Sequence, residues 1–125
     1  MLQRESLLHS PDNSGARLLK CIQILKNTKY NNATIGNKII VTIKKTILKK
    51  KIIKKIKKKE IFECIIIKVK KPIHRIDGTI IKFMTNAGII VKNNIPLCTR
   101  INSVIPNELR RYGYTKIITL SSIII

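Results

Sequence analysis

The side chains that could perform catalysis are few and are spread along the chain. There are two histidines, His9 and His74, and six Asp or Glu residues in 125 positions. Acid–base, nucleophilic and metal-dependent catalysis all require several such groups to converge. The sequence contains no glycine-rich phosphate loop and no HExxH or GxSxG pattern. His74 stands between Lys71 and Arg75, where a solvated or phosphate-contacting imidazole is expected. The sequence therefore predicts no enzymatic activity and no cofactor.

The three cysteines, Cys21, Cys64 and Cys98, are isolated from one another and odd in number. No CxxC pair or Cys/His cluster has the spacing of zinc ligands, and no disulfide framework is indicated. We therefore expect buried free thiols in a reducing compartment, and no metal site.

The most concentrated group of charged side chains in the sequence is cationic. The stretch KKTILKKKIIKKIKKKE, residues 44–60, holds ten lysines in seventeen positions. Such a run could bind RNA phosphates, form a membrane-active amphipathic helix, serve as a nuclear address or reflect codon usage. Four apolar residues do fall at helical spacing beside the lysines, as a membrane-active helix requires: Leu48, Ile52, Ile53 and Ile56. Strand-like sequence on both sides argues against that helix.

The overall charge narrows the class of partner. The formal net charge is +20, from 26 Lys and Arg against 6 Asp and Glu, whereas a small soluble domain typically carries a net charge of about 2 to 8 in magnitude. Self-repulsion of this size favours a polyanionic partner, and we expect nucleic acid rather than a membrane. Because 44% of the residues are hydrophobic, the chain is not a disordered basic tail. The 28 Ile, 20 Lys and 10 Asn also match A/T-rich codons, so some lysines reflect composition alone.

The elements that must position these cations read as short strands. In residues 38–45, Ile39, Val41 and Ile43 alternate with more polar neighbours, which is the period of a half-buried strand. Further strands are predicted at 17–25, 60–70, 79–84, 87–92 and 115–120, with turns at Asp12–Gly15 and Asp77-Gly78. Pro106–Arg111 reads as one or two helical turns that Gly113 can end. This pattern predicts a mainly β fold, a small barrel in a single domain spanning 1–125.

The turns and strands together resemble a known family. "DNSGA", residues 12–16, is followed by a basic residue and a strand, and Cys64 is followed by three aliphatic residues. Further matches follow in the family's order and spacing: Asp77-Gly78, Phe83, Asn86, Ile89-Ile90, "TRI" at 99–101, "ELR" at 108–110 and "KIITL" at 116–120. Over nearly its whole length the chain resembles large-subunit ribosomal protein fourteen. It departs from the family at Cys64 and Cys98, which replace small residues, at Ser103-Val104, which replace Gly-Pro, and in its longer Lys44–Lys59 tract.

The resemblance implies a five-stranded β-barrel with a helical region at about 104–113. It also implies a structural role, in which the protein binds large-subunit rRNA at the face that meets the small subunit. There it would contribute to a bridge with small-subunit rRNA, beside large-subunit proteins three and nineteen, near a surface where a ribosome-silencing factor docks. We predict that the RNA-binding residues are Arg17, Lys44, Lys45, Lys49, Lys50, Lys51, Lys70, Lys71, Arg75, Arg100, Arg110 and Arg111. The structural turns are predicted at Asp12, Asn13, Ser14, Gly15, Asp77 and Gly78.

Two alternatives to a ribosomal protein remain open at this point. One is a free-standing, non-specific nucleic-acid-binding barrel protein, and the other is a membrane-active basic protein. The family's start falls almost at Met1, which leaves no room for a transit or signal peptide. With the A/T-type composition, this predicts synthesis in a mitochondrion; a plastid or the cytoplasm of an A/T-rich bacterium is the alternative.

For the Lys44–Lys59 tract, we predict an extended basic loop or β-ribbon that projects from the barrel onto rRNA. Strands lead in at 41–43 and out at 61–67, so a short connection between neighbouring strands is the simplest topology. β-branched isoleucines and like charges at i and i+4 both disfavour an isolated helix here.

Overall fold

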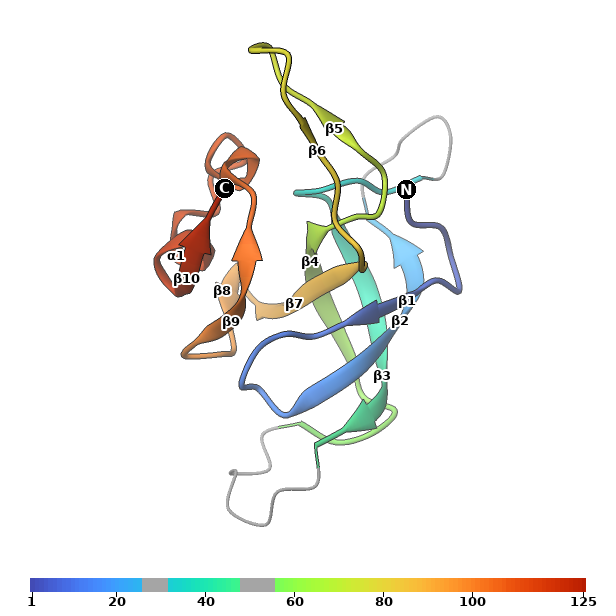
Figure 1. The fold of residues 1–125 in the computed structure, drawn as a ribbon. Helices are drawn as coiled ribbons and strands as arrows, with labels where there is room; N and C mark the ends of the chain where they lie inside the picture. The colour runs from blue at the N-terminus through green and yellow to red at the C-terminus, as the bar shows by residue number, and fades with distance from the viewer. Residues whose placement is uncertain (26–31, 48–55) are drawn as a thin grey trace.

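Five strands close into a barrel (Figure 1). The structure is a computed structural model that describes residues 1–25, 32–47 and 56–125. The barrel strands, in spatial order, are β1 (Leu7–His9), β2 (Ala16–Ile24), β3 (Lys38–Thr46), β4 (Ile61–Lys68) and β7 (Ala87–Lys92). Consecutive members of this series pair antiparallel, and β1 then pairs parallel with β7, where His9 lies opposite Ala87. The predicted mainly β, five-stranded barrel is confirmed.

The barrel strands form because their apolar residues match the sheet period. In β3, Ile39, Val41 and Ile43 are buried while the residues between them are partly exposed, as the alternation predicted. In β4, four consecutive residues, Cys64 to Ile67, are buried, so both faces of this strand are covered. One continuous core cluster joins these side chains to residues of the C-terminal elements, among them Ile105, Leu109 and Ile117.

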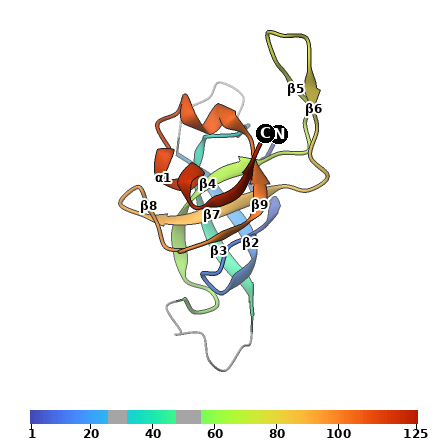
Figure 2. The same ribbon diagram turned by 60° about the vertical axis from the view of Figure 1, so that its left-hand side comes forward.

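The remaining elements flank the barrel (Figures 1 and 2). β5 (Ile73–His74) and β6 (Ile80–Ile81) form a hairpin that projects from it, and β8 (Ile95–Pro96) pairs with β7. β9 (Ile101–Ile105), the 3₁₀ helix η1 (Asn107–Arg110), α1 (Thr115–Thr119) and β10 (Ser121–Ile124) follow in order, and β10 pairs parallel with β9. η1 lies inside the region predicted to be helical, and Gly113 follows it with a φ of +81°.

The prediction of a strand at 115–120 was wrong, because α1 occupies Thr115–Thr119 and the strand begins only at Ser121. Parallel pairing of β9 with β10 requires the chain to travel back along β9 before β10 begins, and η1 and α1 make that return. Ile117 and Ile118 are both buried. A helix against the core can bury two adjacent residues, whereas strand alternation would turn them to opposite faces.

The lysine-rich tract connects β3 with its antiparallel neighbour β4, and its first residues, Lys44 to Thr46, belong to β3 rather than to a loop. Its ends are fastened together, since the Lys59 N–H donates to the Ile43 carbonyl at 3.0 Å and the Ile43 N–H donates to the Glu60 carbonyl at 3.3 Å. Ile56 is buried in the core cluster, so the returning arm of the tract is anchored to the barrel. Lys49, Lys50 and Lys51 lie outside the described residues.

Candidate nucleic-acid interface

The Asp12–Gly15 turn is organised by one buried carboxylate. Asp12 Oδ1 accepts hydrogen bonds from the Ser14 N–H at 3.2 Å, the Ser14 hydroxyl at 2.6 Å and the Ser10 hydroxyl at 3.1 Å. Burial raises the pKa of the Asp12 carboxyl, and the hydrogen bonds from Ser14 and Ser10 oppose that rise. Gly15 supplies the positive φ, +100°, that lets the chain enter β2. The predicted structural turn is therefore built from these residues' own side chains.

Asn13 fastens this turn to the segment that precedes β9. Its amide nitrogen donates to the Thr99 hydroxyl at 2.7 Å, and its Oδ1 accepts from the backbone N–H groups of Thr99 and Arg100 at 3.0 and 3.2 Å. The Asn13 N–H in turn donates to the Arg100 carbonyl at 3.3 Å. Two family motifs that stand far apart in sequence are thus held side by side.

The same turn also touches the start of the lysine-rich tract. The Gly15 carbonyl accepts from the Ile47 N–H at 2.9 Å, and Leu18 lies opposite Lys45 in the β2–β3 ladder. Four exposed basic residues consequently lie on the segments that meet at this turn, and we call them the turn cluster: Arg17, Lys44, Lys45 and Arg100. The C-terminal end of β3, where the tract begins, lies at this end of the barrel (Figure 1).

A second cationic region lies at the β5–β6 hairpin. At the Asp77-Gly78 turn, Gly78 has a φ of +83° and Asp77 Oδ1 accepts from the Thr79 N–H and hydroxyl at 3.0 and 2.7 Å. Those hydrogen bonds from Thr79 lower the pKa of Asp77. The turn is therefore closed by its own residues, with no need for an external partner.

Arg75 joins the hairpin to η1. Its Nε donates to Glu108 Oε1 at 2.7 Å, and its Nη2 donates to Glu108 Oε2 at 3.1 Å and to the Ile125 carbonyl oxygen at 2.8 Å. The hydrogen bond with Arg75 lowers the pKa of Glu108, and the same bond raises the pKa of Arg75. The two-pronged geometry is that of a strong, orientation-specific ion pair.

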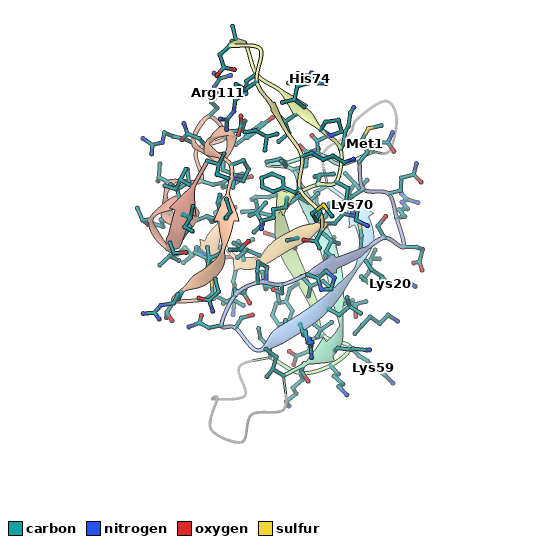
Figure 3. The ribbon with its side chains drawn as sticks, viewed as in Figure 1. Met1, Lys20, Lys59, Lys70, His74 and Arg111 are labelled. Atoms are coloured by element: carbon teal, nitrogen blue, oxygen red, sulfur yellow. The ribbon has the colours of Figure 1, made fainter. Side chains whose placement is uncertain are left out.

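Between the hairpin and η1 lies a groove of about 530 Å³, which we call the hairpin groove. The basic side chains that line it, apart from the paired Arg75, are His74, Arg110 and Arg111. Figure 3 shows His74 and Arg111 at the hairpin end of the molecule, with Lys59 at the opposite end. The structure therefore carries basic residues at both ends of the barrel.

The structure places some of the predicted RNA-binding residues at opposite ends of a strand and pairs another with a carboxylate. Arg100 precedes β9 while Arg110 and Arg111 follow it, so the three arginines lie at opposite ends of that strand. Arg75, predicted to contact RNA, is bound to Glu108. Lys70 and Lys71 are exposed on the link between β4 and β5. The sequence did not predict the contacts of Asn13 with Arg100 and of Arg75 with Glu108. These residues are 87 and 33 positions apart, and no local sequence pattern connects residues so distant.

Other chemistry in the described part of the chain is sparse. The three cysteines are buried and free, as predicted, and burial raises the pKa of Cys98 to about 12. Across residues 1–25, 32–47 and 56–125, no group of three or more His, Cys, Asp or Glu side chains is placed to hold a metal ion. Within the same ranges, no helix has the length and apolar character needed to cross a membrane.

Comparison with protein families gives one result that covers all of these features. The model for the family described as Ribosomal protein L14p/L23e matches residues 1–125, the whole chain. The match includes both turns, the closed barrel and the C-terminal elements. This chain belongs to the ribosomal protein L14p/L23e family.

Proposed function

We propose that this protein, as a structural component of the large ribosomal subunit, binds large-subunit rRNA through cations at both ends of its barrel. Membership of the family supports the ribosomal role and a structural rather than enzymatic activity. The turn cluster and the exposed lysines Lys70 and Lys71 supply the RNA contacts at the barrel surface. The predicted single domain, residues 1–125, acts as the binding unit.

The observation that carries the proposal is the shortage of carboxylate partners for the basic side chains. Within the described residues only two ion pairs form, Lys20 with Glu5 and Arg75 with Glu108. The other described Lys and Arg side chains have no carboxylate partner, and a chain with a net charge of +20 needs counter-charge from outside. Phosphates satisfy that need, and RNA is bound largely through shape, phosphate and 2′-hydroxyl contacts.

Subunit fractionation tests this proposal. Ribosomes are separated on density gradients in moderate salt, and the protein is followed by immunodetection. We expect it to stay with the large subunit. A free-standing nucleic-acid-binding barrel, the competing function, would dissociate as salt rises and spread over RNA-containing fractions.

The family also supports a place at the subunit interface. We infer that Arg100, Arg110 and Arg111 contribute to a bridge with small-subunit rRNA, beside large-subunit proteins three and nineteen. A ribosome-silencing factor is a further proposed partner of this surface. Because Arg100 lies at the opposite end of β9 from Arg110, the variants Arg100→Glu and Arg110→Glu are best tested separately. Each is expected to reduce subunit joining more than it reduces the stability of the isolated large subunit, and normal joining in both would contradict the bridge.

The ribosomal role places the protein with ribosomes. We propose the mitochondrial ribosome, on the A/T-type composition of the chain. Mapping the gene to an organellar or a nuclear genome tests this directly.

A further inference from the structure

We propose that Arg75 is a positioning residue and not an RNA contact: paired with Glu108, it holds the β5–β6 hairpin against η1, and the hairpin groove so formed binds an RNA phosphodiester backbone through Arg110, Arg111 and His74. This inference rests on the proposed RNA-binding function and assigns that function a site and an internal support.

The Arg75 guanidinium is already committed within the protein. Three of its five N–H donors are engaged, two by the Glu108 carboxylate and one by the Ile125 carbonyl oxygen. Its side chain is 27% exposed and that of Glu108 is 22% exposed, so the pair is shielded from water on most sides. A phosphate approaching Arg75 would have to displace a carboxylate held at two points, which disfavours direct contact.

Both walls of the groove are weak as isolated elements. The hairpin has only two residue pairs, Ile73 with Ile81 and His74 with Ile80, and a short two-stranded hairpin is marginal by itself. η1 is four residues long and has no side-chain hydrogen bond at its N-cap. The Arg75–Glu108 pair spans the two walls, which stand 33 residues apart in sequence. We infer that this pair sets their separation.

The charges left facing the groove are positive. Its two carboxylates are already satisfied, since Glu108 is paired with Arg75 and Asp77 accepts from Thr79. Arg110 and Arg111 are exposed and form no ion pair within the described residues. Two adjacent arginines on the η1 wall of an open groove suit a phosphate chain, because each planar guanidinium can bind phosphate oxygens in two-pronged fashion.

The first test follows each arginine directly. The chain has six arginines, so the Nε–H signals of the ¹⁵N-labelled protein can be assigned by substituting them one at a time. An RNA stem-loop is titrated into the whole protein while these signals are recorded by NMR. We expect the Arg110 and Arg111 signals to shift on binding, and the Arg75 signal to keep its position because its bond to Glu108 persists. A shifted Arg75, or unshifted Arg110 and Arg111 in a protein that binds the stem-loop, would overturn the inference while leaving the proposed function intact. No binding at all would overturn both.

The second test reverses the pair. Arg75→Glu places two carboxylates together and should weaken stem-loop binding about tenfold, as expected when charge-assisted contacts are lost. Adding Glu108→Arg restores an opposite-charge pair and should recover most of that affinity. Arg4→Glu, the same charge change at an exposed position outside the groove, is the matched control and should have a smaller effect. If the folded double variant binds as weakly as Arg75→Glu, Arg75 acts by direct contact and the inference fails.

Discussion

Gly88 of β7 leaves no space for a side chain in the barrel. A Cβ there would lie 2.5 Å from Cys64 Sγ and 3.3 Å from the Ile65 carbonyl oxygen. We expect Gly88→Ala to lower the free energy of unfolding by about 1–3 kcal/mol, the usual cost of overpacking. Removing the sulfur with Cys64→Ala should reduce that cost, since the two side chains compete for one space. Denaturant unfolding of both single variants and the double variant measures the coupling. Equal costs of Gly88→Ala in the two backgrounds would show that the sulfur is not the obstacle.

Asp12 makes a residue-level prediction about pH. Burial raises the pKa of its carboxyl above the ordinary 3.8, so the folded protein binds this proton more readily than the unfolded chain. The stability contributed by the protonated form is present below pH 3.8 and is lost as pH rises through the higher folded-state pKa. Glu108 acts in the opposite sense: its pKa is lowered from 4.5, so its contribution is lost as pH falls below that value. In the wild-type protein, the Asp12 contribution to the free energy of unfolding should therefore fall as pH rises through the folded-state pKa of Asp12. The variant Asp12→Asn should not show that fall when its unfolding is measured across acidic pH. An unchanged profile in that variant would mean that another group is responsible.

At the scale of elements, the turn before β2 and the start of β9 depend on Asn13. Asn13→Ala removes its side-chain bonds to Thr99 and Arg100. We expect a loss of about 1–3 kcal/mol in unfolding free energy, together with weaker RNA binding because Arg100 is no longer held beside the turn. Asn102→Ala, an exposed asparagine on β9 itself, is the control and should change both quantities little. If Asn13→Ala is destabilised but still binds RNA with full affinity, the Asn13 contacts support the fold and are not needed for RNA binding.

The elements also show what local sequence can and cannot predict. Alternating isoleucine and valine predicted β3 correctly, since the period of two is set by the strand itself. The same β-branched residues misled at 115–120, where parallel pairing of β10 with β9 required a helical return. Glu108 was predicted as part of the ELR motif in a helical segment, and nothing in that local context indicates its bond to Arg75. Contacts between residues that are distant in sequence depend on the tertiary fold and leave no short-range sequence pattern.

At the scale of the whole molecule, salt dependence should report how many cations meet phosphate. Each phosphate contact contributes about 0.7 to 0.9 to the slope of log affinity against log salt. If Lys49, Lys50 and Lys51 all contact RNA, replacing the three by Gln should flatten the slope by about 2 to 3 and leave the barrel folded. Lys20→Gln is the control, because Lys20 is paired with Glu5 and should change the slope little. An unchanged slope in the triple variant would mean that these lysines do not contact RNA and reflect the A/T-rich codon composition alone.

The parallel contact that closes the barrel has a consequence for how the chain folds during synthesis. At that seam the His9 N–H donates to the Asn86 carbonyl at 2.9 Å, and the Ser10 hydroxyl donates to the Gly88 carbonyl at 3.4 Å across 78 positions. β1 therefore emerges from the exit tunnel long before its closing partner does. Contacts this distant in sequence slow folding, and the waiting chain exposes unpaired strand edges rich in isoleucine. We expect the nascent chain to need protection from aggregation until β7 has been made, and closure to be a late folding event.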